Sequence, residues 1–351
     1  MTSKPKVLFI TPLLSSFIRN DIEMLTNEYD LRVNKYQWHK KYFVPFYLIH
    51  QIFYTLFHIH TTSKIVIQFG GYWSFIPVIL GKLFQVKTYI VLHGTDCASI
   101  PSLNYGSLRK PILRWVIKQS LCNAFKLLPV SSSLVQTHNT FLGETKESNQ
   151  GYKTFFMSGT APHEVIPNGV DECFWKNENV ERKNQSFLTI SSNTRFTLKG
   201  VDLILEIAKN LPHCNFYVAG ATMPVNVGVK LKNVLFLGHL SREQLREYYN
   251  SVEYYMQLSA YEGFGISLCE AMLCGCIPIG SSVNVIPEII GDSGFILEKK
   301  YANELQKTLQ NVINTSDLEK QKLSKLARER VVNKYSFTRR KEALLRVLKE
   351  A

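Results

Sequence analysis

The chain alternates short apolar runs with longer amphipathic segments, and it does so once in each half. Runs such as Val7–Ile10 and Lys64–Gln68 have the length and the β-branched content of buried strands, whereas segments such as Phe17–Thr26 place apolar residues at helical spacing. Strands that alternate with helices form parallel sheets covered on both faces. The pattern therefore predicts an α/β protein built from two doubly wound, Rossmann-like units in tandem.

The predicted strands are spread evenly along the chain. In the first half they are Val7–Ile10, Leu31–Val33, Lys64–Gln68, Thr88–Leu92, Lys126–Val130 and Val165–Ile166. In the second half they are Ser186–Ile190, Asn215–Ala219, Val234–Leu237, Tyr254–Gln257, Cys276–Ile279 and Gly294–Ile296. The predicted helices between them are Phe17–Thr26, Phe75–Phe84, Ile112–Cys122, Leu203–Lys209, Arg242–Asn250 and Ile266–Cys274.

A length of 351 residues suits two domains of ordinary size. The polar stretch Lys176–Asn184 marks the boundary, so we predict a first domain over residues 1–175 and a second over 176–334. The basic amphipathic tail, residues 335–351, fits neither repeat and is expected to pack back on the first domain. Two such domains leave a central cleft in which the carboxyl ends of their strands face each other, the usual ligand position.

The positive charge of the chain is unevenly placed. The net charge is +13, and residues 1–160 hold 17 Lys/Arg against 7 Asp/Glu. Such an excess favours an anionic partner: nucleic acid, acidic lipid headgroups or a phosphorylated acceptor. No nucleic-acid-binding module is recognisable, so a nucleic-acid partner is the weakest of these alternatives.

Several classes of protein are excluded by composition. The seven cysteines are scattered and odd in number, which indicates reduced thiols in a cytoplasmic protein rather than a disulfide framework or a zinc site. The first apolar run is too short and too early for a signal peptide. The longest apolar stretch, Tyr42–Ile59, contains Pro45 and His50 and is shorter than a spanning helix requires. The stretch His39–His60 is predicted to be a helix that covers the sheet, with interfacial membrane contact as the alternative.

The segment from Tyr261 to Met272 is the richest in chemistry. Gly263 and Gly265 flank an aromatic residue after a strand and before a helical run. Glycine lets the backbone approach a ligand closely, and a helix start offers unpaired N–H groups and a positive dipole end, which together suit a diphosphate. Glu262 precedes this turn and Glu270 lies one helical turn later. The alternative is an ordinary connection with Glu270 on a solvated face.

These motifs resemble those of the retaining glycosyltransferases of family 4, whose two-domain architecture is called GT-B. The family signature is matched by Glu262, Gly263-Phe264-Gly265, Glu270, Ala271-Met272 and Gly275-Cys276-Ile277-Pro278. Further motifs follow in the expected order, over roughly residues 60–300: His93-Gly94-Thr95-Asp96, Ile166-Pro167-Asn168-Gly169-Val170-Asp171, Lys199-Gly200-Val201-Asp202, Phe236-Leu237-Gly238 and Val285-Ile286-Pro287-Glu288.

The resemblance implies a GT-B fold with an N-terminal acceptor domain and a C-terminal donor domain, and it implies roles for single residues. His93, Lys199 and Glu262 would be the catalytic residues: Lys199 would neutralise the donor diphosphate, Glu262 would hold sugar hydroxyls, and His93 would face the transferred sugar. Glu270 would hold the ribose. The implied donor-binding set is Ser15, Ser16, Arg195, Lys199, Glu262, Gly263, Phe264, Gly265, Ile266, Ser267 and Glu270. Gly70, Gly71 and Tyr72 would line the acceptor side, or pack between helix and sheet.

Two departures from the family pattern stand out. Arg195 lies only four residues before Lys199, which is closer than the usual spacing. Either the loop is shortened and Arg195 still reaches the phosphates, or Arg195 is an ordinary surface residue. The first loop also lacks the paired glycines of many members, although Ser15 and Ser16 could donate to a phosphate from the helix start.

The expected function is transfer of a hexose-type sugar from a nucleoside-diphosphate sugar to a glycan or lipid-linked acceptor, in polysaccharide or glycolipid synthesis. No Asp-x-Asp occurs, so we expect neither a catalytic metal nor a resident cofactor. The protein is expected in the cytoplasm or on the inner face of an anionic membrane. A nucleotide-sugar epimerase of the same fold is the enzymatic alternative, and a nucleic-acid-binding protein is a weaker one.

Overall fold

The computed structural model describes residues 4–38, 40–223 and 231–350, which form two compact units. The first unit contains the chain up to His138, Asn149–Gly169 and the residues from Phe337 on. The second contains Asn139–Ser148 and Val170–Ser336. The units therefore divide after residue 169, where the sequence placed the division after 175, and the second unit takes up a short segment from within the first.

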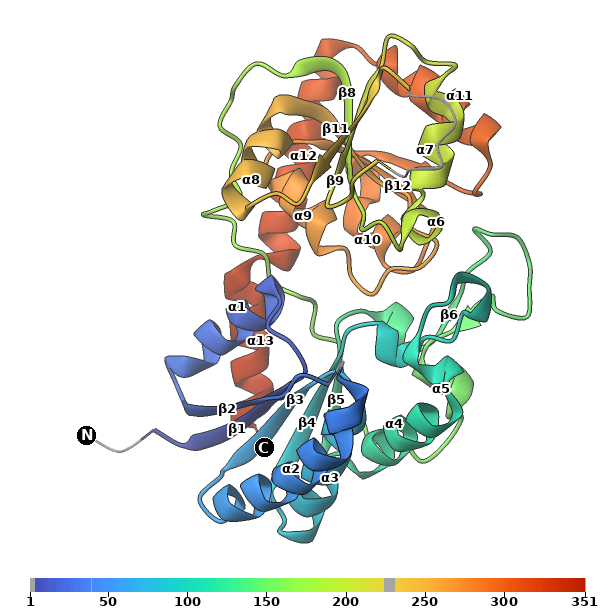
Figure 1. Cartoon of the computed structure of the whole chain (residues 1–351). Helices are drawn as coiled ribbons and strands as arrows, with labels where there is room; N and C mark the ends of the chain where they lie inside the picture. The colour runs from blue at the N-terminus through green and yellow to red at the C-terminus, as the bar shows by residue number, and fades with distance from the viewer. Residues whose placement is uncertain (1–3, 39, 224–230, 351) are drawn as a thin grey trace. The chain divides into compact units, whose positions relative to one another are not determined.

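The first unit is built on a five-stranded parallel sheet in the order β2-β1-β3-β4-β5 (Figure 1). Its strands are β1 (Lys6–Thr11), β2 (Asp30–Lys35), β3 (Lys64–Gln68), β4 (Lys87–Leu92) and β5 (Lys126–Pro129). The chain adds β2 on one side of β1 and β3 on the other, so the topological switch point lies between β1 and β3. Ligands of doubly wound sheets bind outside the strand ends at such a point.

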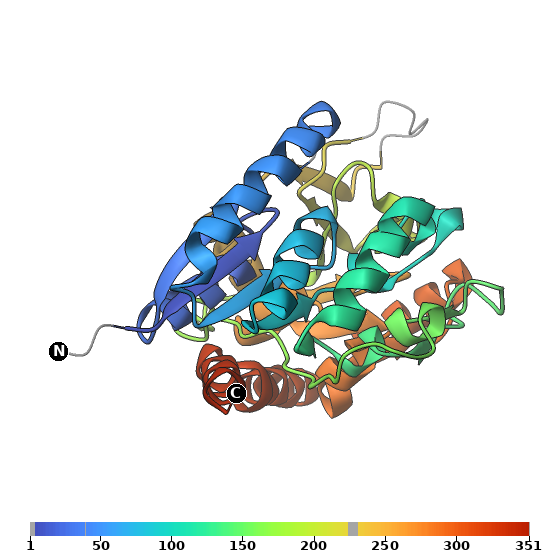
Figure 2. The same cartoon turned by 90° about the horizontal axis from the view of Figure 1, so that it is seen from below.

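Helices cover both faces of this sheet. They are α1 (Ser16–Thr26), α2 (Val44–Ile59), α3 (Tyr72–Leu83), α4 (Pro111–Asn123), the short α5 (Tyr152–Phe155) and α13 (Phe337–Lys349). Helices α2, α3 and α4 lie side by side, whereas α1 packs against α13 (Figure 2). Strands buried on both faces read as continuous apolar runs, and Val7–Ile10 in β1 is at most 1% exposed. His39, at the head of the predicted helix His39–His60, lies outside the described residues.

One predicted strand is wrong. Val165–Ile166 forms no strand, although Glu164 N and Ile166 N donate to carbonyls of β5 at 3.0 and 2.9 Å. Prolines 162 and 167 bracket this run, and proline has no N–H to offer a ladder. The segment therefore touches the edge of the sheet without extending it. A small antiparallel pair, β6 (Thr137–His138) with β7 (Asn149–Gln150), also belongs to this unit.

A buried ion pair anchors α13 to the first unit. The Arg340 guanidinium donates to both carboxylate oxygens of Asp21 on α1, at 2.5 and 2.7 Å, and both side chains are 1% exposed. The same guanidinium donates to the carbonyls of Ile166 and Pro167 at 3.1 and 2.9 Å. A buried charge needs such complete pairing, because the loss of its hydration is otherwise uncompensated.

The second unit has a six-stranded parallel sheet in the order β10-β9-β8-β11-β12-β13. Its switch point lies between β8, the first strand, and β11. The strands are β8 (Lys183–Ile190), β9 (Asn215–Ala219), β10 (Val234–Gly238), β11 (Val252–Gln257), β12 (Ile277–Ser281) and β13 (Phe295–Leu297). The helices are α6 (Phe196–Lys199), α7 (Val201–Ala208), α8 (Arg242–Ser251), α9 (Ile266–Leu273), α10 (Ile286–Ile290), α11 (Ala302–Ile313) and α12 (Asp317–Tyr335).

The segment 139–148 joins the second unit through specific contacts. Asn139 Nδ2 donates to the carbonyl of Ala260 at 2.8 Å, and the backbone N–H of Lys300 donates to the carbonyl of Phe141 at 2.8 Å. The Phe141 side chain is buried, at 1% exposed. Sequence periodicity gives no sign of this pairing, because it joins residues more than a hundred positions apart.

Candidate active site

The switch point of the second unit carries a lysine–glutamate pair. Lys199 follows β8 at the end of α6, and Glu262 follows the adjacent strand β11. Lys199 Nζ lies 2.7 Å from Glu262 Oε2, and the two side chains are 21% and 15% exposed. The loops are also joined through the backbone, since Ala260 N donates to Leu198 O at 2.8 Å. The structure thus brings together the two residues predicted to serve the diphosphate and the sugar.

Glu262 is held by polar neighbours that sequence reasoning missed. Its Oε2 also accepts hydrogen bonds from Gln257 Nε2 at 2.8 Å and from Ser259 Oγ at 3.1 Å. The Gln257 amide is itself oriented, because its Oε1 accepts a bond from the Tyr255 hydroxyl at 3.0 Å. The available signal was position: Gln257 and Ser259 stand at the carboxyl end of β11, where side chains point toward the switch point. A carboxylate with several donors on one oxygen has a fixed orientation.

Two glycines shape the backbone around this pair. Gly200 has a φ of +74°, and a Cβ there would lie 2.5 Å from the carbonyl oxygen of Leu258. Gly265 has a φ of +99° and is the N-cap of α9, with no side chain that caps the helix. Any other residue type would be strained at these two positions. The first N–H groups of α9, at Ile266 and Ser267, have no acceptor within the helix and can serve an anion.

The other residues of the glycine turn are largely buried. Phe264 is 3% exposed and packs edge-on against Tyr335 of α12, with ring centroids 5.5 Å apart. Its side chain therefore fixes the turn from behind, which leaves ligand contact at this turn to the backbone. Gly263 is also buried.

Glu270 does not lie on a solvated face, so that alternative is wrong. It is 8% exposed, within α9. Burial raises the pKa of Glu270 to about 8, and the positive charge of Arg242 opposes this increase. A buried carboxyl such as Glu270, one turn into α9, is a good candidate to bind neutral hydroxyls, because it can lose its proton and accept their hydrogen bonds instead.

Arg195 occupies the N-cap of α6 and is exposed. Its carbonyl accepts the backbone N–H of Lys199 at 2.9 Å, so the two residues are one helical turn apart. Residues at this spacing share a helix face. The structure therefore places the backbone of Arg195 one turn before Lys199, and its contact with a phosphate remains a prediction.

In the first unit, His93 lies at the end of β4 and is part of a buried chain of hydrogen bonds. His93 Nε2 is 2.7 Å from Gln68 Oε1, and Gln68 Nε2 donates to Asp21 Oδ2 at 3.1 Å. The amide orientation makes His93 Nε2 the protonated nitrogen, so Nδ1 is left as an acceptor. Burial and, to a smaller extent, the charge of Arg340 hold the pKa of His93 well below its usual value, which keeps the ring neutral.

Asp96 organises the turn that follows His93. Its Oδ1 accepts the N–H groups of His93 and Gly94 at 3.1 and 2.9 Å, and its Oδ2 accepts that of Gly70 at 2.9 Å. Asp96 is fully buried. The turns after β3 and β4 are therefore tied together, which places Gly70 and the His93 backbone at one end of the sheet.

The remaining first-unit candidates differ in their surroundings. Ser15 is the N-cap of α1, and its Oγ is buried without a hydrogen-bond partner among the described residues, whereas Ser16 is exposed. The ring of Phe17, one position further, lies 4.8 Å from that of His93. A Cβ on Gly71 would meet the Trp73 ring at 2.5 Å, so this glycine has a packing role, and Tyr72 beside it is half-buried.

Within the described ranges, no group of three or more His, Cys, Asp or Glu side chains is arranged to hold a metal ion. None of the helices that the structure describes has both the length and the apolar character needed to cross a bilayer.

Comparison with known proteins gives a family match for part of the chain and a fold for all of it. Residues 173–330 match the family "Glycosyl transferases group 1". One component of the phosphatidylinositol N-acetylglucosaminyltransferase of Arabidopsis thaliana is 25% identical over 177 residues, which is 46% of this chain but only 39% of the relative. Sucrose-phosphate synthase from Thermosynechococcus elongatus superposes over 99% of both chains with a TM-score of 0.76 at 15% identity. HepE from Anabaena, in complex with UDP and glucose, covers 99% of this chain and 100% of its own with a TM-score of 0.69 at 13% identity.

The two parallel α/β sheets are thus those of a GT-B-like fold, and the switch-point residues of the second unit carry the predicted motifs. Residues 173–330, which contain these switch-point residues, match the glycosyl transferases group 1 family.

Proposed function

We propose that this protein transfers a hexose-type sugar from a nucleoside-diphosphate sugar to an acceptor, with retention of the anomeric configuration. The observation that carries the proposal is the Lys199–Glu262 pair at the switch point of the second unit. A cation is poised where a diphosphate would enter, and the open N-terminus of α9 offers a second positive element. The named ligands of HepE, UDP and glucose, support the same class of donor.

In this proposal, donor binding exchanges one partner of the ion pair for another. The diphosphate takes the ammonium of Lys199, and Glu262 is released to accept hydroxyl groups of the sugar. Gln257 and Ser259 keep the Glu262 carboxylate oriented during this exchange. The site is therefore preorganised, because its charges are already paired and need only short movements to meet the donor.

The chemical step proposed is a front-face displacement. The bond from C1 of the sugar to the diphosphate oxygen breaks, and its electron pair leaves with the phosphate. The acceptor oxygen forms the new bond to C1 on the same face, and its proton passes to a phosphate oxygen of the departing group. Lys199 and the α9 amides stabilise the negative charge that grows on that group. Burial holds the pKa of His93 well below its usual value, which makes the ring a poor base, so His93 would position the sugar rather than take the acceptor's proton.

The acceptor is proposed to be a glycan or a lipid-linked glycan, and the role to lie in polysaccharide or glycolipid synthesis. The Arabidopsis relative is named for phosphatidylinositol, which is a phospholipid. An acceptor of this class, presented at the inner face of an anionic membrane, fits the positive charge of residues 1–160.

A panel of sugar nucleotides tests the proposed donor. A ligand at about 100 times its dissociation constant stabilises the folded protein by roughly 2.7 kcal/mol, which a thermal-shift assay detects. The selected donor is then incubated with and without a glycan acceptor, and the products are identified by NMR. Retained configuration in a new glycoside supports the proposal. An isomerised sugar nucleotide formed without acceptor would instead establish the epimerase.

We expect substitutions of Glu262 and Glu270 to differ in their effects on nucleotide binding. Glu262→Gln should impair transfer and leave affinity for UDP nearly unchanged, since its carboxylate is assigned to the sugar. Glu270→Gln should weaken UDP about tenfold at pH 8.5, the magnitude of one charge-assisted hydrogen bond. Calorimetric titration of both variants provides the measurement, and equal losses of UDP affinity would show that the carboxylates are wrongly assigned.

The raised pKa of Glu270 adds a pH dependence to this comparison. Below about pH 8 the buried carboxyl is protonated in the empty site, so binding of the ribose to its ionised form must release a proton. Wild-type affinity for UDP should therefore increase from pH 6.5 to about pH 8 and then level off. The phosphate also titrates in this range, and Glu270→Gln removes only the contribution of the carboxyl. An unchanged pH profile in that variant would contradict the assignment.

Transfer should not depend on a divalent cation. The proposed leaving-group site consists of a lysine and a helix terminus, and the sequence contains no Asp-x-Asp. Activity measured in excess EDTA should match activity in buffer alone. Loss of activity with EDTA that Mn²⁺ or Mg²⁺ restores would refute this account of the diphosphate site.

A further inference from the structure

Helix α2 buries polar side chains and exposes apolar ones. The residues that it buries are Gln51, Thr55 and Ile59, two of them polar. The Gln51 amide is held inside by a 3.1 Å hydrogen bond to the carbonyl of Trp73. A helix on the surface of a protein in water normally shows the opposite arrangement, with its apolar stripe toward the core.

The outward face of α2 is a row of large apolar side chains. Their exposed fractions are 61% for Phe46, 56% for Ile49, 68% for Phe53 and 81% for Phe57. Spacings of three and four residues place them on one side of the helix. No residue of Val44–Ile59 is charged, and the 16-residue helix is about 24 Å long, too short to span a bilayer. This face fits a helix that lies in an interface, parallel to it.

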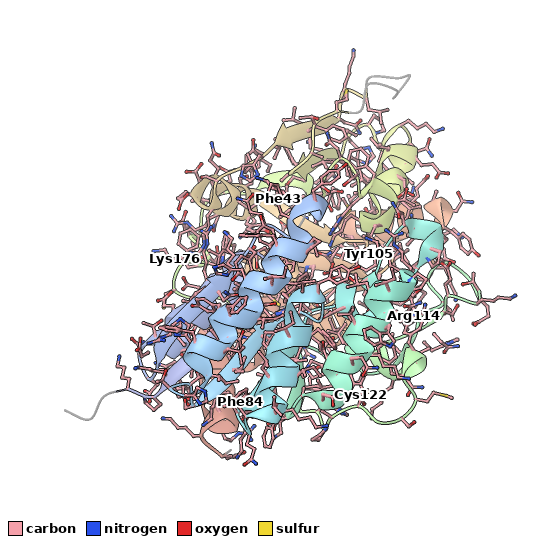
Figure 3. All side chains as sticks on the ribbon, turned by 60° about the horizontal axis from the view of Figure 1, so that its bottom comes forward. Phe43, Phe84, Tyr105, Arg114, Cys122 and Lys176 are labelled. Carbon is pink, nitrogen blue, oxygen red and sulfur yellow. The ribbon has the colours of Figure 1, made fainter. Side chains whose placement is uncertain are left out.

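The two neighbouring helices extend the same surface. On α3, Leu83 is 71% exposed, and on α4 the exposed fractions are 72% for Ile112 and 54% for Trp115. Figure 3 shows α2, α3 and α4 side by side, with Phe43 at the head of α2, Phe84 beyond the end of α3 and Arg114 on α4. We name this surface, formed by the outward side chains of α2, α3 and α4, the three-helix face. Exposed apolar patches of this kind mark interaction sites.

The charge of the surrounding sequence selects the partner. Residues 31–143 contain a single acidic residue, Asp96, and it is buried in the turn after β4. The same stretch contains twelve basic residues: Arg32, Lys35, Lys40, Lys41, Lys64, Lys82, Lys87, Arg109, Lys110, Arg114, Lys118 and Lys126. Of these, Lys82, Arg114 and Lys118 are exposed on α3 and α4, within the three-helix face itself. A second copy of the same face would bring like charges together, which disfavours self-association.

We propose that the three-helix face docks on an anionic lipid bilayer, with the α2 stripe in the headgroup region and the lysines and arginines of α3 and α4 against the lipid phosphates. The apolar and the electrostatic contributions act together, as in other interfacial helices. The inference deepens the proposed function, because it rests on a membrane-presented acceptor, yet the binding itself requires no substrate.

Flotation with lipid vesicles tests the proposal directly. The probes are vesicles of phosphatidylcholine alone and vesicles in which about 30% of the lipid is anionic phosphatidylglycerol. Wild-type protein should bind the anionic vesicles at low salt and lose most of this binding at 1 M salt, where the Debye length is about 3 Å. Phe53→Asp should reduce the bound fraction by about tenfold or more, because it places a carboxylate in the stripe.

A matched control separates the stripe from a general effect of charge. Leu318 on α12 of the second unit is 79% exposed, so Leu318→Asp adds the same charge at an equally open position. Its vesicle binding should stay within about twofold of wild type. Trp115 gives an independent readout, since lipids brominated near the headgroup should quench its fluorescence in wild type, and the extent of quenching should fall in Trp115→Phe.

The possible outcomes are distinct. Absence of binding to anionic vesicles, or equal losses in Phe53→Asp and Leu318→Asp, would overturn the docking proposal. So would a dimer in lipid-free solution that Phe53→Asp dissociates, since the face would then serve a second copy. Transfer to a soluble acceptor should be unchanged in Phe53→Asp, because α2 carries no residue of the proposed site. The transfer assay therefore tests the proposed function, and the vesicle assay separately tests membrane docking.

Discussion

Replacing Lys199 by alanine should lower kcat by about 10²-fold or more. The ammonium of Lys199 is fixed 2.7 Å from Glu262 and lies beside the start of the loop that leads into α9. In the proposed reaction, negative charge accumulates on the departing diphosphate, and removal of one preorganised donor from such a site typically costs ~3 kcal/mol of transition-state stabilisation. Steady-state kinetics with the selected sugar nucleotide measure the effect. A kcat within a factor of three of wild type would contradict the assignment of Lys199 to the diphosphate.

The second unit provides a matched control for this variant. Lys320 on α12 lies 3.0 Å from Glu253, and both side chains are 14% exposed, so the pair resembles Lys199–Glu262 in distance and burial. It stands at the start of β11 rather than at its carboxyl end. Lys320→Ala should therefore cost a comparable amount of stability and leave kcat within a few-fold of wild type. Equal losses of activity in both variants would mean that Lys199 acts through folding alone.

Arg195→Ala is informative in the same assay. Arg195 is one helical turn before Lys199, at the position where the sequence left two alternatives open. A further loss of kcat would establish that the short loop still delivers the arginine to the phosphates. An unchanged kcat would identify Arg195 as a surface residue.

The central strands of both units could be predicted because they are buried on both faces. Their apolar runs are then continuous and short, which a single sequence displays clearly. The prediction of Lys64–Gln68 and Asn215–Ala219 matches β3 and β9. The run Val165–Ile166 has the same local character and forms no strand, since its bonds to β5, from Glu164 N and Ile166 N, end at the prolines on either side. What pairs with a strand is a tertiary property, and composition does not contain it.

The candidate residues of the second unit were predictable because they belong to contiguous motifs around glycines with positive φ. Gly200 and Gly265 require their backbone conformations, so the motif and its geometry are inseparable. The supporting residues were not predictable in this way. Gln257 and Ser259 are ordinary polar residues in sequence, and only the sheet shows that they converge on Glu262.

The inward face of α2 and the partners of His93 show the same limit. The sequence His39–His60 indicates a covering helix, but the side of it that faces outward is set by how the helix packs against α3. Asp21 and Arg340 are more than three hundred positions apart, and each reads locally as a charged residue on an amphipathic helix. Their burial at 1% exposure is visible only in the folded unit.

Arg340→Met should destabilise the first unit by about 3–5 kcal/mol, because it leaves the carboxylate of Asp21 buried without its partner. The same substitution removes the hydrogen-bond donor of two backbone carbonyls, those of Ile166 and Pro167. Calorimetric melting should show a decrease in Tm on the order of 10 °C, at roughly 2–4 °C per kcal/mol. Lys349→Met on the same helix is the control, since its pair with Glu28 is exposed and should leave Tm close to wild type.

A double variant distinguishes a lost ion pair from a loss of packing. Asp21→Leu combined with Arg340→Met removes both charges, and replacement of a whole buried pair by apolar residues is often neutral or stabilising, so most of the lost Tm should return. The restored fold would still lack the Asp21 carboxylate, which accepts a hydrogen bond from Gln68 Nε2. That bond orients Gln68 so that its Oε1 faces His93. We therefore expect recovery of stability without full recovery of kcat. A double variant that melts as early as Arg340→Met would assign the effect to packing of α13, and one with wild-type kcat would remove Asp21 from the positioning of His93.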